Sequence, residues 1–260
     1  MKRTNPIVEL YSYRYVLEQL IRQQLVLRYR RTFFGYLWTL INPLLTMSIT
    51  AIVFSALFKM DLKTYVVYLF SGLMAWNFFS AVIIQSSGVF VANESLIKKI
   101  FIPKIIFPLS QSIGILIDSL LSFIAIYAII YFINPVISWS ILFIPAAYLI
   151  LYIFSFGIAL LVSVATIFYR DLQHVVTVLM QAWFFLTPVM YKVGGLSLEA
   201  SFLIKLNPIM PFIELFRAPL FLNQIPEAGT LATCCIYSAV SVTLGVSVFS
   251  RYKNLIIYRL

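Results

Sequence analysis

Long stretches without a charged residue dominate the chain. Residues 35–58, 64–93 and 119–169 contain no Asp, Glu, Lys or Arg. A helix that spans a bilayer needs about 20 consecutive apolar residues, so each stretch can hold at least one span and the third is too long for only one. Asn134-Pro135, a dipeptide typical of turns, divides the third stretch into a hairpin of two spans.

The whole pattern predicts an all-α membrane protein with six transmembrane helices. It begins with an interfacial amphipathic helix and a basic junction within residues 1–34, and it ends with a tail over residues 251–260. Apolar positions at helical spacing support the interfacial helix, which we expect along the inner leaflet. Between these segments the six-span domain occupies residues 35–250, with spans over residues 35–58, 64–92, 105–133, 139–169, 172–191 and 228–250.

The segment between the last two spans, residues 192–227, mixes charged with apolar residues and is interrupted by four prolines. It is too polar to span a bilayer and too apolar for a simple solvated loop. We expect short amphipathic or re-entrant helices that lie on the bundle at its extracytoplasmic side. An ordinary extracytoplasmic loop is the alternative.

The composition agrees with lipid as the main solvent of this chain. Hydrophobic residues make up 62% and charged residues 11% of the 260 residues, whereas soluble domains have about 45–50% apolar and about 25% charged residues. This balance excludes a large soluble catalytic domain. The two cysteines, Cys234 and Cys235, are adjacent in an apolar stretch, and we expect them to be buried rather than bridged.

The distribution of charge predicts the orientation in the membrane. Fourteen of the nineteen Lys and Arg residues lie on the side of the N-terminus when the six spans are drawn. Positively charged residues are enriched in cytoplasmic loops, so we expect both termini in the cytoplasm. The same bias accounts for the net charge of +10, and no nucleic-acid partner is needed to explain it.

The densest basic cluster precedes the first predicted span. It consists of Arg28, Arg30 and Arg31, with Tyr29 between them. In one interpretation the arginines only anchor the end of the span at the membrane surface. In the other, clustered guanidinium groups at headgroup depth bind a lipid phosphate or pyrophosphate through paired hydrogen bonds. Both interpretations place the cluster at the cytoplasmic surface.

Two short cytoplasmic segments are candidates for contact with a soluble partner. Residues 93–101 predict a two-turn helix that is capped by Asn93 and stopped by Pro103. This helix is either a docking element or an ordinary surface helix, and the next cytoplasmic turn is either a second docking point or a local ion pair. The candidate contact residues are Glu94, Leu96, Lys98, Lys99, Phe101, Arg170 and Asp171.

Asp118 is the one ionisable residue in the middle of a predicted span. A carboxyl group at this depth is costly unless it is paired, hydrated or protonated, which makes Asp118 a candidate functional residue. A neutral acid that is hydrogen-bonded within the bundle or across a subunit contact is the alternative. The chain has a single His and no ligand cluster with metal spacing, so we expect no metal site.

Motifs for nucleotide hydrolysis and for acyl transfer are missing from the sequence. No GxxxxGK[ST] loop is present to hold ATP phosphates, and no GxSxG motif is present. We therefore expect the energy source to be a separate polypeptide. Aromatic faces can pack on sugar rings while Tyr and Trp keep a hydrogen-bonding end, and the candidates for lining such a path are Trp38, Trp183, Phe184, Phe185 and Tyr191.

Several short motifs resemble one known family. The block Leu27 to Trp38, with the sequence LRYRRTFFGYLW, joins the basic junction to Asn42-Pro43 inside the first span. Further blocks are Tyr169-Arg170-Asp171-Leu172, Thr187-Pro188-Val189-Met190-Tyr191, and Leu206-Asn207-Pro208 followed by Arg217. Together they resemble the permease subunits of type-2 ABC exporters that move polysaccharides, such as O-antigen, capsule and teichoic-acid exporters.

The resemblance implies a transport subunit without its own ATPase site or bound cofactor. The chain would form a homodimer in the bacterial inner membrane with two copies of a separate ABC ATPase, which uses ATP and Mg²⁺. The substrate would be a lipid-linked polysaccharide, such as O-antigen on undecaprenyl pyrophosphate, with capsular polysaccharide or teichoic acid as alternatives. Residues 94–101 would form a coupling helix, and gate helices after the fifth span would contain Asn207, Pro208, Glu214 and Arg217.

Two other classes of protein are alternatives to an export subunit. A membrane glycosyltransferase or phosphotransferase acting on lipid-linked sugars would need clustered acids at one membrane face. Glu94 and Asp171 are a poor substitute, because they are far apart in the sequence. A proton-coupled carrier would depend on Asp118, and the variant Asp118→Asn would then lose transport while assembling normally.

Overall fold

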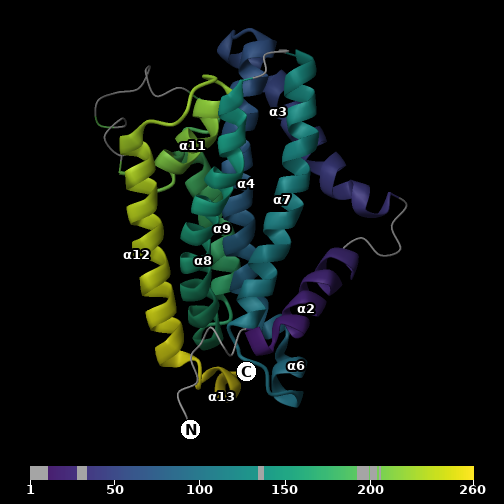
Figure 1. Ribbon diagram of the computed structural model, residues 1–260, viewed down its shortest axis with the longest axis vertical. Coiled ribbons are helices and arrows are strands. Elements are labelled where there is room, and N and C mark those ends of the chain that lie inside the picture. Colours follow the sequence, from purple (N-terminus) through teal and green to yellow (C-terminus); the bar gives the residue numbers. More distant parts are fainter. Residues whose placement is uncertain (1–10, 28–33, 134–137, 192–198, 200–203, 205) are drawn as a thin grey trace.

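The computed structural model describes residues 11–27, 34–133, 138–191, 199, 204 and 206–260. Within these residues the chain is all-α, as predicted, and contains no β-strand (Figure 1). Two 3-10 helices, η1 (Gly35–Leu37) and η2 (Trp139–Phe143), precede longer helices. The α-helices are α2 (Arg14–Leu27), α3 (Trp38–Phe58), α4 (Leu62–Ser87), α5 (Val89–Ala92), α6 (Glu94–Lys99), α7 (Ile106–Ile133), α8 (Ile144–Phe168), α9 (Leu172–Leu186), α11 (Met210–Leu220), α12 (Ala228–Tyr252) and α13 (Ile256–Arg259).

Five helical segments of the described chain are long and apolar enough to cross a membrane. They are Leu40–Phe58, Leu62–Ser87, Ile106–Phe132, Trp139–Phe168 and Ala228–Tyr252. The predicted second span, residues 64–92, is shorter in the structure, because α4 ends before Gly88 and α5 follows as a separate turn.

The predicted fifth span, residues 172–191, also differs from the structure. Helix α9 has 15 residues and ends at Leu186, since Thr187 precedes a proline and adopts an extended backbone. At 1.5 Å per residue such a helix rises about 22 Å, whereas the hydrocarbon core of a bilayer is about 30 Å thick. The six-span topology therefore stays a prediction.

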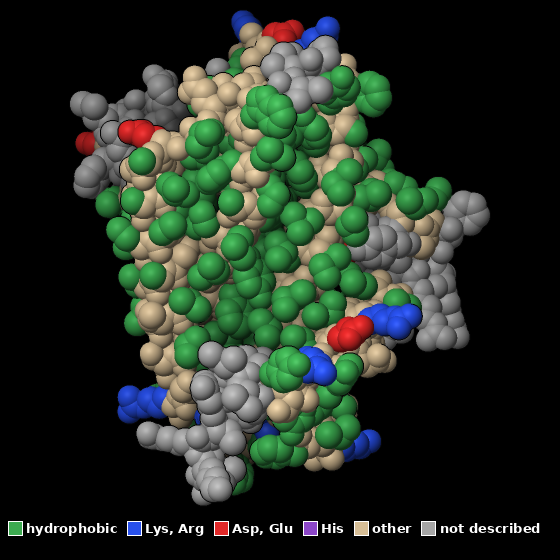
Figure 2. Space-filling model, in the orientation of Figure 1, with side chains coloured by type: hydrophobic (Ala, Val, Ile, Leu, Met, Phe, Trp, Pro, Cys, Tyr) green, Lys and Arg blue, Asp and Glu red, His purple; other side chains and the backbone are tan. Residues whose placement is uncertain are grey.

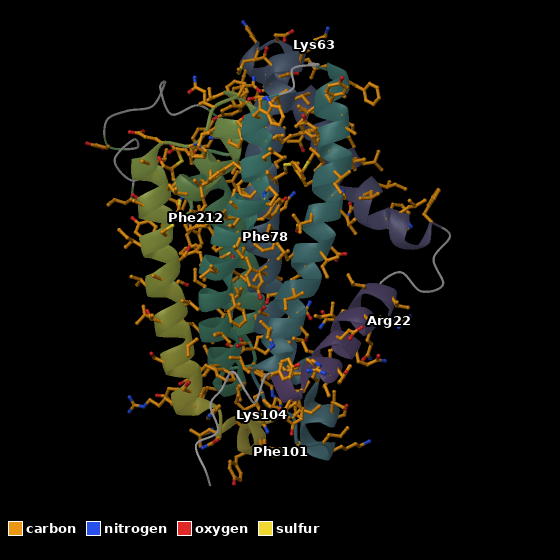
Figure 3. All side chains as sticks on the ribbon, in the orientation of Figure 1. Arg22, Lys63, Phe78, Phe101, Lys104 and Phe212 are labelled. Atoms are coloured by element: carbon orange, nitrogen blue, oxygen red, sulfur yellow. The ribbon has the colours of Figure 1, made fainter. Side chains whose placement is uncertain are left out.

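Helix α4 forms the centre of the bundle. In its most apolar stretch 78% of the residues are buried inside the protein, compared with 17% for α3 and 22% for α7 and α12. It packs against α3, α7, α8, α9 and α11 (Figure 1). Figure 3 shows Phe78 of α4 and Phe212 of α11 within the bundle, between Lys63 at one end and Lys104 at the other. Helix α4 thus contributes to each internal site described below.

The outer surface of the bundle is apolar over most of its length. Figure 2 shows a broad hydrophobic band with Lys, Arg, Asp and Glu toward its two ends. Large apolar side chains stay exposed on several helices, among them Ile52, Ile124 and Ile236 at 59–63%. A surface of this kind is suited to contact with lipid.

The turn between α3 and α4 shows how one span ends and the next begins. Lys59 has a left-handed backbone, with φ of 50°, and closes α3. The Asp61 carboxylate then accepts a hydrogen bond from the backbone N–H of Thr64 at 3.0 Å and caps α4. This hydrogen bond lowers the pKa of Asp61.

Small residues bring α8 and α12 into close contact. A Cβ atom added to Gly245 would lie 2.3 Å from the carbonyl oxygen of Gly157, so a larger residue does not fit there. Beside this crossing the hydroxyl group of Ser241 donates a hydrogen bond to the carbonyl oxygen of Phe154 at 2.7 Å. Small and hydroxyl-bearing residues at helix contacts are typical of membrane proteins.

Helix α2 packs against α7 at the end of the bundle that carries α6 and α13 (Figure 1). Its Leu20 is buried in the same apolar cluster as Phe107 of α7. Gln24 lies directly over Gly114, where an added Cβ atom would be 2.9 Å from the Gln24 Oε1 atom. Helix α2 therefore has a specific contact with a spanning helix, while its interfacial position stays a prediction.

Candidate functional site

The chain leaves α9 in an extended conformation. Thr187 has φ of −103° and ψ of 129°, and residues 188–191 follow it in the part of the chain that the structure describes. Their carbonyl groups lie beyond the hydrogen-bond ladder of α9. A buried carbonyl group without a donor costs about 1–3 kcal/mol, so these groups need partners from other elements.

Three side chains supply those partners, and we call Tyr65, Tyr68 and Arg217 the carbonyl clamp. The Arg217 Nη2 atom donates to the carbonyl oxygens of Pro188 at 2.7 Å and Val189 at 2.8 Å. The hydroxyl group of Tyr65 donates to Met190 at 2.9 Å, and that of Tyr68 donates to Tyr191 at 2.8 Å. Four consecutive carbonyl groups are thus bound by side chains of α4 and α11.

The Arg217 guanidinium group is buried, with 8% of the residue exposed. Its central carbon lies 4.0 Å from the centre of the Tyr68 ring, at a distance where the ring face attracts a cation. Gly72 of α4 leaves the space that the arginine occupies, because a Cβ atom there would lie 3.1 Å from Nη2. The ring face of Tyr68 and the space left by Gly72 therefore hold the charged Arg217 guanidinium group in the clamp.

Asn207 connects α9 to the start of α11. Its Oδ1 atom accepts hydrogen bonds from the Trp183 indole N–H at 3.0 Å and from the Ile209 backbone N–H at 3.2 Å. Its Nδ2 atom donates to the Thr187 hydroxyl group at 2.9 Å. The buried Asn207 side chain thus joins both ends of the segment between α9 and α11.

The four predicted gate residues lie in or beside this region. Asn207 and Arg217 are buried and hydrogen-bonded, Pro208 is half-buried, and Glu214 is exposed on α11. The structure thus shows a helix after α9 that packs against α4 and α8. A gating role for these residues stays a prediction.

The predicted path-lining aromatic residues have different surroundings. The Trp183 ring packs edge-on against Phe79, with ring centres 5.6 Å apart, and is half-buried. Phe184 is half-buried, Phe185 is 70% exposed, and Tyr191 donates a hydrogen bond to the carbonyl oxygen of Phe185.

A groove of about 360 Å³ runs between α4 and α9. Phe184 and Phe185 line it together with Asn77, Ser80 and Gln181. Asn77 and Gln181 are exposed although they lie within apolar helices, which is costly against lipid tails. The groove is therefore suited to a polar environment rather than to lipid contact.

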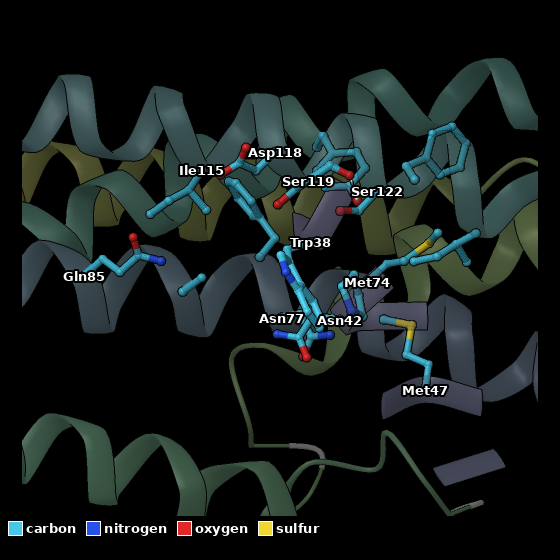
Figure 4. A pocket seen from close by; sticks show the side chains of 16 residues that line it. Trp38, Asn42, Met47, Met74, Asn77, Gln85, Ile115, Asp118, Ser119 and Ser122 are labelled. Atoms are coloured by element: carbon cyan, nitrogen blue, oxygen red, sulfur yellow. Dashed lines mark hydrogen bonds between the residues drawn. The ribbon is translucent and has the colours of Figure 1, made fainter. Parts of the chain in front are cut away.

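A second hollow, the α3–α4–α7 cavity, shares Asn77 with this groove. Its volume is about 210 Å³. Figure 4 shows Trp38 and Asn42 of α3 and Asn77 of α4 near Asp118, Ser119 and Ser122 of α7. The predicted aromatic candidate Trp38 and the predicted functional acid Asp118 thus meet in one cavity.

A smaller cavity of about 160 Å³ adjoins this one at Gln85, Ile115 and Asp118, which line both. Its other walls come from Gln24 of α2 and from Gln111 and Gly114 of α7. The amide group of Gln111 donates a hydrogen bond to Gln85 Oε1 at 2.8 Å. Polar side chains therefore continue from α2 to the middle of α4.

The two predicted partner-contact segments are close together at the α6 end of the bundle. A hydrogen bond of 2.6 Å from Lys98 lowers the pKa of Glu94, and the positive charge of Arg170 lowers it further. Arg170 also donates to the carbonyl oxygen of Leu260 at 3.2 Å. The other candidates of this surface are Leu96, which is half-buried, and Lys99, Phe101 and Asp171, which are exposed.

The local structure of α6 differs from the sequence prediction in one respect. Asn93 occupies the N-cap position, but its side chain donates to the carbonyl oxygen of Val89 at 2.7 Å instead of capping α6. The helix ends at Lys99, before Pro103. A docking role for this end of the bundle stays a prediction.

Sequence reasoning did not identify Tyr65, Tyr68 and Asn77. The two tyrosines are typical of interfacial belts, and nothing in their spacing indicates the carbonyl groups that they bind. Asn77 carried a signal, because an amide in the middle of an apolar helix is unusual. The predicted headgroup residues Arg28, Tyr29, Arg30 and Arg31 lie outside the described residues.

The apolar surface, the long helices and the internal polar groups define a multi-pass helical membrane protein. The chain matches the ABC-2 type transporter family over residues 15–221. It therefore belongs to that family, which confirms the resemblance stated above. Permeases of this family work with a separate ATPase subunit.

Several similar proteins match this chain over nearly its whole length. An O-antigen export system permease protein RfbA from Myxococcus xanthus is 28% identical over 248 residues, which are 95% of either chain. A protein of the same name from Klebsiella pneumoniae is 28% identical over 94% of this chain and 95% of its own. The polysialic acid transport protein KpsM of Escherichia coli is 21% identical over 89% of this chain and 91% of its own.

Proposed function

We propose that this chain is the transmembrane subunit of an ATP-driven exporter that moves a lipid-linked polysaccharide out of the cytoplasm. The match over 95% of the chain to a permease named for O-antigen export carries this proposal. O-antigen on undecaprenyl pyrophosphate is the substrate that we favour. The polysialic acid transport protein among the relatives supports capsular polysaccharide as the second candidate, and a teichoic acid is a third.

The proposed assembly is a homodimer in the bacterial inner membrane with two ATPase subunits on its cytoplasmic side. The groove between α4 and α9 supports a polysaccharide path at a subunit contact, since it carries exposed amide and aromatic groups at membrane depth. The α6 end, with exposed Lys98, Lys99 and Phe101, is the surface that we assign to the ATPase. This orientation agrees with the positive-inside bias, which puts both termini in the cytoplasm.

The first test is genetic. Deleting the gene in its own host should abolish surface polysaccharide and leave the lipid-linked precursor inside the cell, and a plasmid copy should restore export. Surface polysaccharide is measured by immunoblot, and the lipid carrier of the accumulated precursor is identified by mass spectrometry. Unchanged surface polysaccharide in the deletion strain would exclude the export function.

The second test concerns the source of energy. The purified chain should not hydrolyse ATP, whereas the chain copurified with its ATPase should do so. ATP hydrolysis by the chain alone would contradict the division into two subunits. Transfer of sugar from a donor by membranes that contain only this chain would support the transferase alternative, which the comparisons do not favour.

The basic junction is a separate part of the proposal. We expect Arg28, Arg30 and Arg31, with Tyr29, to bind the pyrophosphate group of the lipid carrier. The double variant Arg30→Ala with Arg31→Ala should then reduce export more than membrane insertion. Normal surface polysaccharide in this variant would contradict the headgroup site without contradicting export.

A further inference from the structure

The α3–α4–α7 cavity contains two side-chain amides that no described protein group satisfies. Within the described part of the chain, the side-chain amides of Asn42 and Asn77 have no hydrogen-bond partner. Both residues border the cavity and are exposed, so a molecule can reach them from outside the subunit. An unsatisfied polar group in the hydrocarbon region costs several kcal/mol. Something other than lipid tails must therefore contact these amides.

The chemistry of the lining indicates what that molecule is. Amide and hydroxyl groups, from Asn42, Asn77 and Ser119, both donate and accept hydrogen bonds. Asp118 lies beside these groups, and the Trp38 indole ring adds an apolar face. Sugar rings carry hydroxyl groups around an apolar C–H face, so this set of groups matches a sugar.

The same lining disfavours a phosphate group. Among the described residues that border the cavity, none is Lys, Arg or His, and one is an acid. Phosphate sites are built from cationic side chains or from rows of backbone N–H groups. A neutral, hydroxyl-rich ligand is therefore a better match for the cavity than the pyrophosphate group of a lipid carrier.

The size of the cavity limits the length of the ligand. Pockets for drug-sized molecules have volumes of about 300–1,000 Å³, and this cavity has about 210 Å³. It is also much larger than the roughly 30 Å³ that one water molecule occupies in the liquid. One sugar ring fits these limits better than an oligosaccharide.

We infer that the α3–α4–α7 cavity binds one neutral sugar residue of the exported polysaccharide through its hydroxyl groups. In this assignment the amides of Asn42 and Asn77 and the hydroxyl group of Ser119 bond to the sugar, and Trp38 packs on its ring face. The inference rests on the proposed function, because export supplies the polysaccharide. It places this contact inside one subunit, beside the groove between α4 and α9 that shares Asn77.

Binding is tested on the chain copurified with its ATPase in lipid nanodiscs. The probes are the neutral monosaccharides released by acid hydrolysis of the host's own surface polysaccharide, with inorganic phosphate as the negative probe. At least one monosaccharide should change the tryptophan fluorescence in a saturable way, and the change should be lost in Trp38→Phe. In Asn77→Leu the affinity should fall about tenfold, the ratio that corresponds to 1.4 kcal/mol.

Export is tested in the deletion strain with the variants Asn77→Leu and Ser119→Val. Both should lower surface polysaccharide about tenfold, because a tenfold loss of sugar affinity should slow transport to the same extent. The amount and the thermal stability of each variant protein should equal those of the wild type. Leu121→Val is the matched control on α7, because Leu121 is 38% exposed and does not border the cavity. This control should export as the wild type does.

The outcomes separate this inference from the proposed function. If the deletion strain still displays its polysaccharide, the export function itself is wrong. If deletion abolishes export but Asn77→Leu and Ser119→Val export normally, the cavity holds only water and the sugar site is wrong. The absence of saturable binding for every monosaccharide probe, or equal affinity in Asn77→Leu, would also overturn it.

Discussion

The carbonyl clamp and the α3–α4–α7 cavity are two polar regions built on the same helix, α4, but the donors of the clamp and the side-chain amides of the cavity have opposite surroundings. In the clamp, Tyr65, Tyr68 and Arg217 donate to four carbonyl groups at 2.7–2.9 Å. In the cavity, within the described residues, the amides of Asn42 and Asn77 have no protein partner.

The difference separates polar groups that hold the protein together from polar groups that are available to a ligand. A buried donor or acceptor that has protein partners stabilises one arrangement of the chain, and its removal leaves those partners unpaired. The clamp thus joins the end of α9 to α4 and α11. The cavity is bordered by α3, of which only 17% of the apolar stretch is buried inside the protein.

The largest effect is expected from Arg217→Ala. The substitution removes the donor of two carbonyl groups, and each unpaired buried carbonyl costs about 1–3 kcal/mol, so the free energy of unfolding should fall by about 2–6 kcal/mol. Unfolding can be followed by thiol labelling of Cys234, which is buried, in a background that carries Cys235→Ser. The labelling midpoint should shift to a clearly lower temperature.

Arg251→Ala is the matched control for this variant. Arg251 is exposed near the end of α12, and its loss should leave the midpoint unchanged. Arg217→Lys should lie between the wild type and Arg217→Ala, because an ammonium group keeps the charge but not the planar guanidinium geometry. If Arg217→Ala and Arg251→Ala unfold at the same temperature, the clamp does not hold the α9 end.

A smaller effect is expected from Tyr65→Phe. This variant keeps the buried ring, removes the hydrogen bond to Met190 and leaves one carbonyl group unpaired instead of two, so it should lower the free energy of unfolding by about 1–3 kcal/mol. The same thiol-labelling assay measures it. A double-mutant cycle with Arg217→Ala should show coupling, since both residues bind neighbouring carbonyl groups of one segment. Strict additivity would mean that the two contacts act separately.

Much of the helical framework was predictable because charge-free stretches and turn dipeptides depend on local sequence. The end of α7 at Ile133 and the short helix after Asn93 follow from such signals. The length of α9 was predicted less well, although Thr187-Pro188 carries the signal for its end. Apolar residues continue to Tyr191, and the pattern of hydrophobicity alone does not show where the helix stops.

The polar regions could not be predicted in the same way, because they depend on contacts between helices that sequence spacing does not encode. Asn207 and Arg217 were singled out by motif, but their partners Trp183, Pro188 and Val189 became visible only when α9, α11 and α4 were packed together. Asp118 was identified from its depth in a span. Its neighbours in the cavity come from α3 and α4, which no periodicity within α7 indicates.

The smallest effect is expected from Asn77→Leu in the cavity, and the same substitution at Asn207, beside the clamp, provides the contrast. Asn207→Leu leaves the Trp183 indole N–H and the Ile209 backbone N–H without an acceptor, and each orphaned donor costs about 1–3 kcal/mol. Asn77→Leu removes an amide that has no partner among the described residues, so the free energy of unfolding should change by less than about 1 kcal/mol or rise. Thermal unfolding in the same detergent measures both. A loss of stability in Asn77→Leu as large as that in Asn207→Leu would mean that Asn77 holds the bundle together, and its amide would then not be available to a ligand.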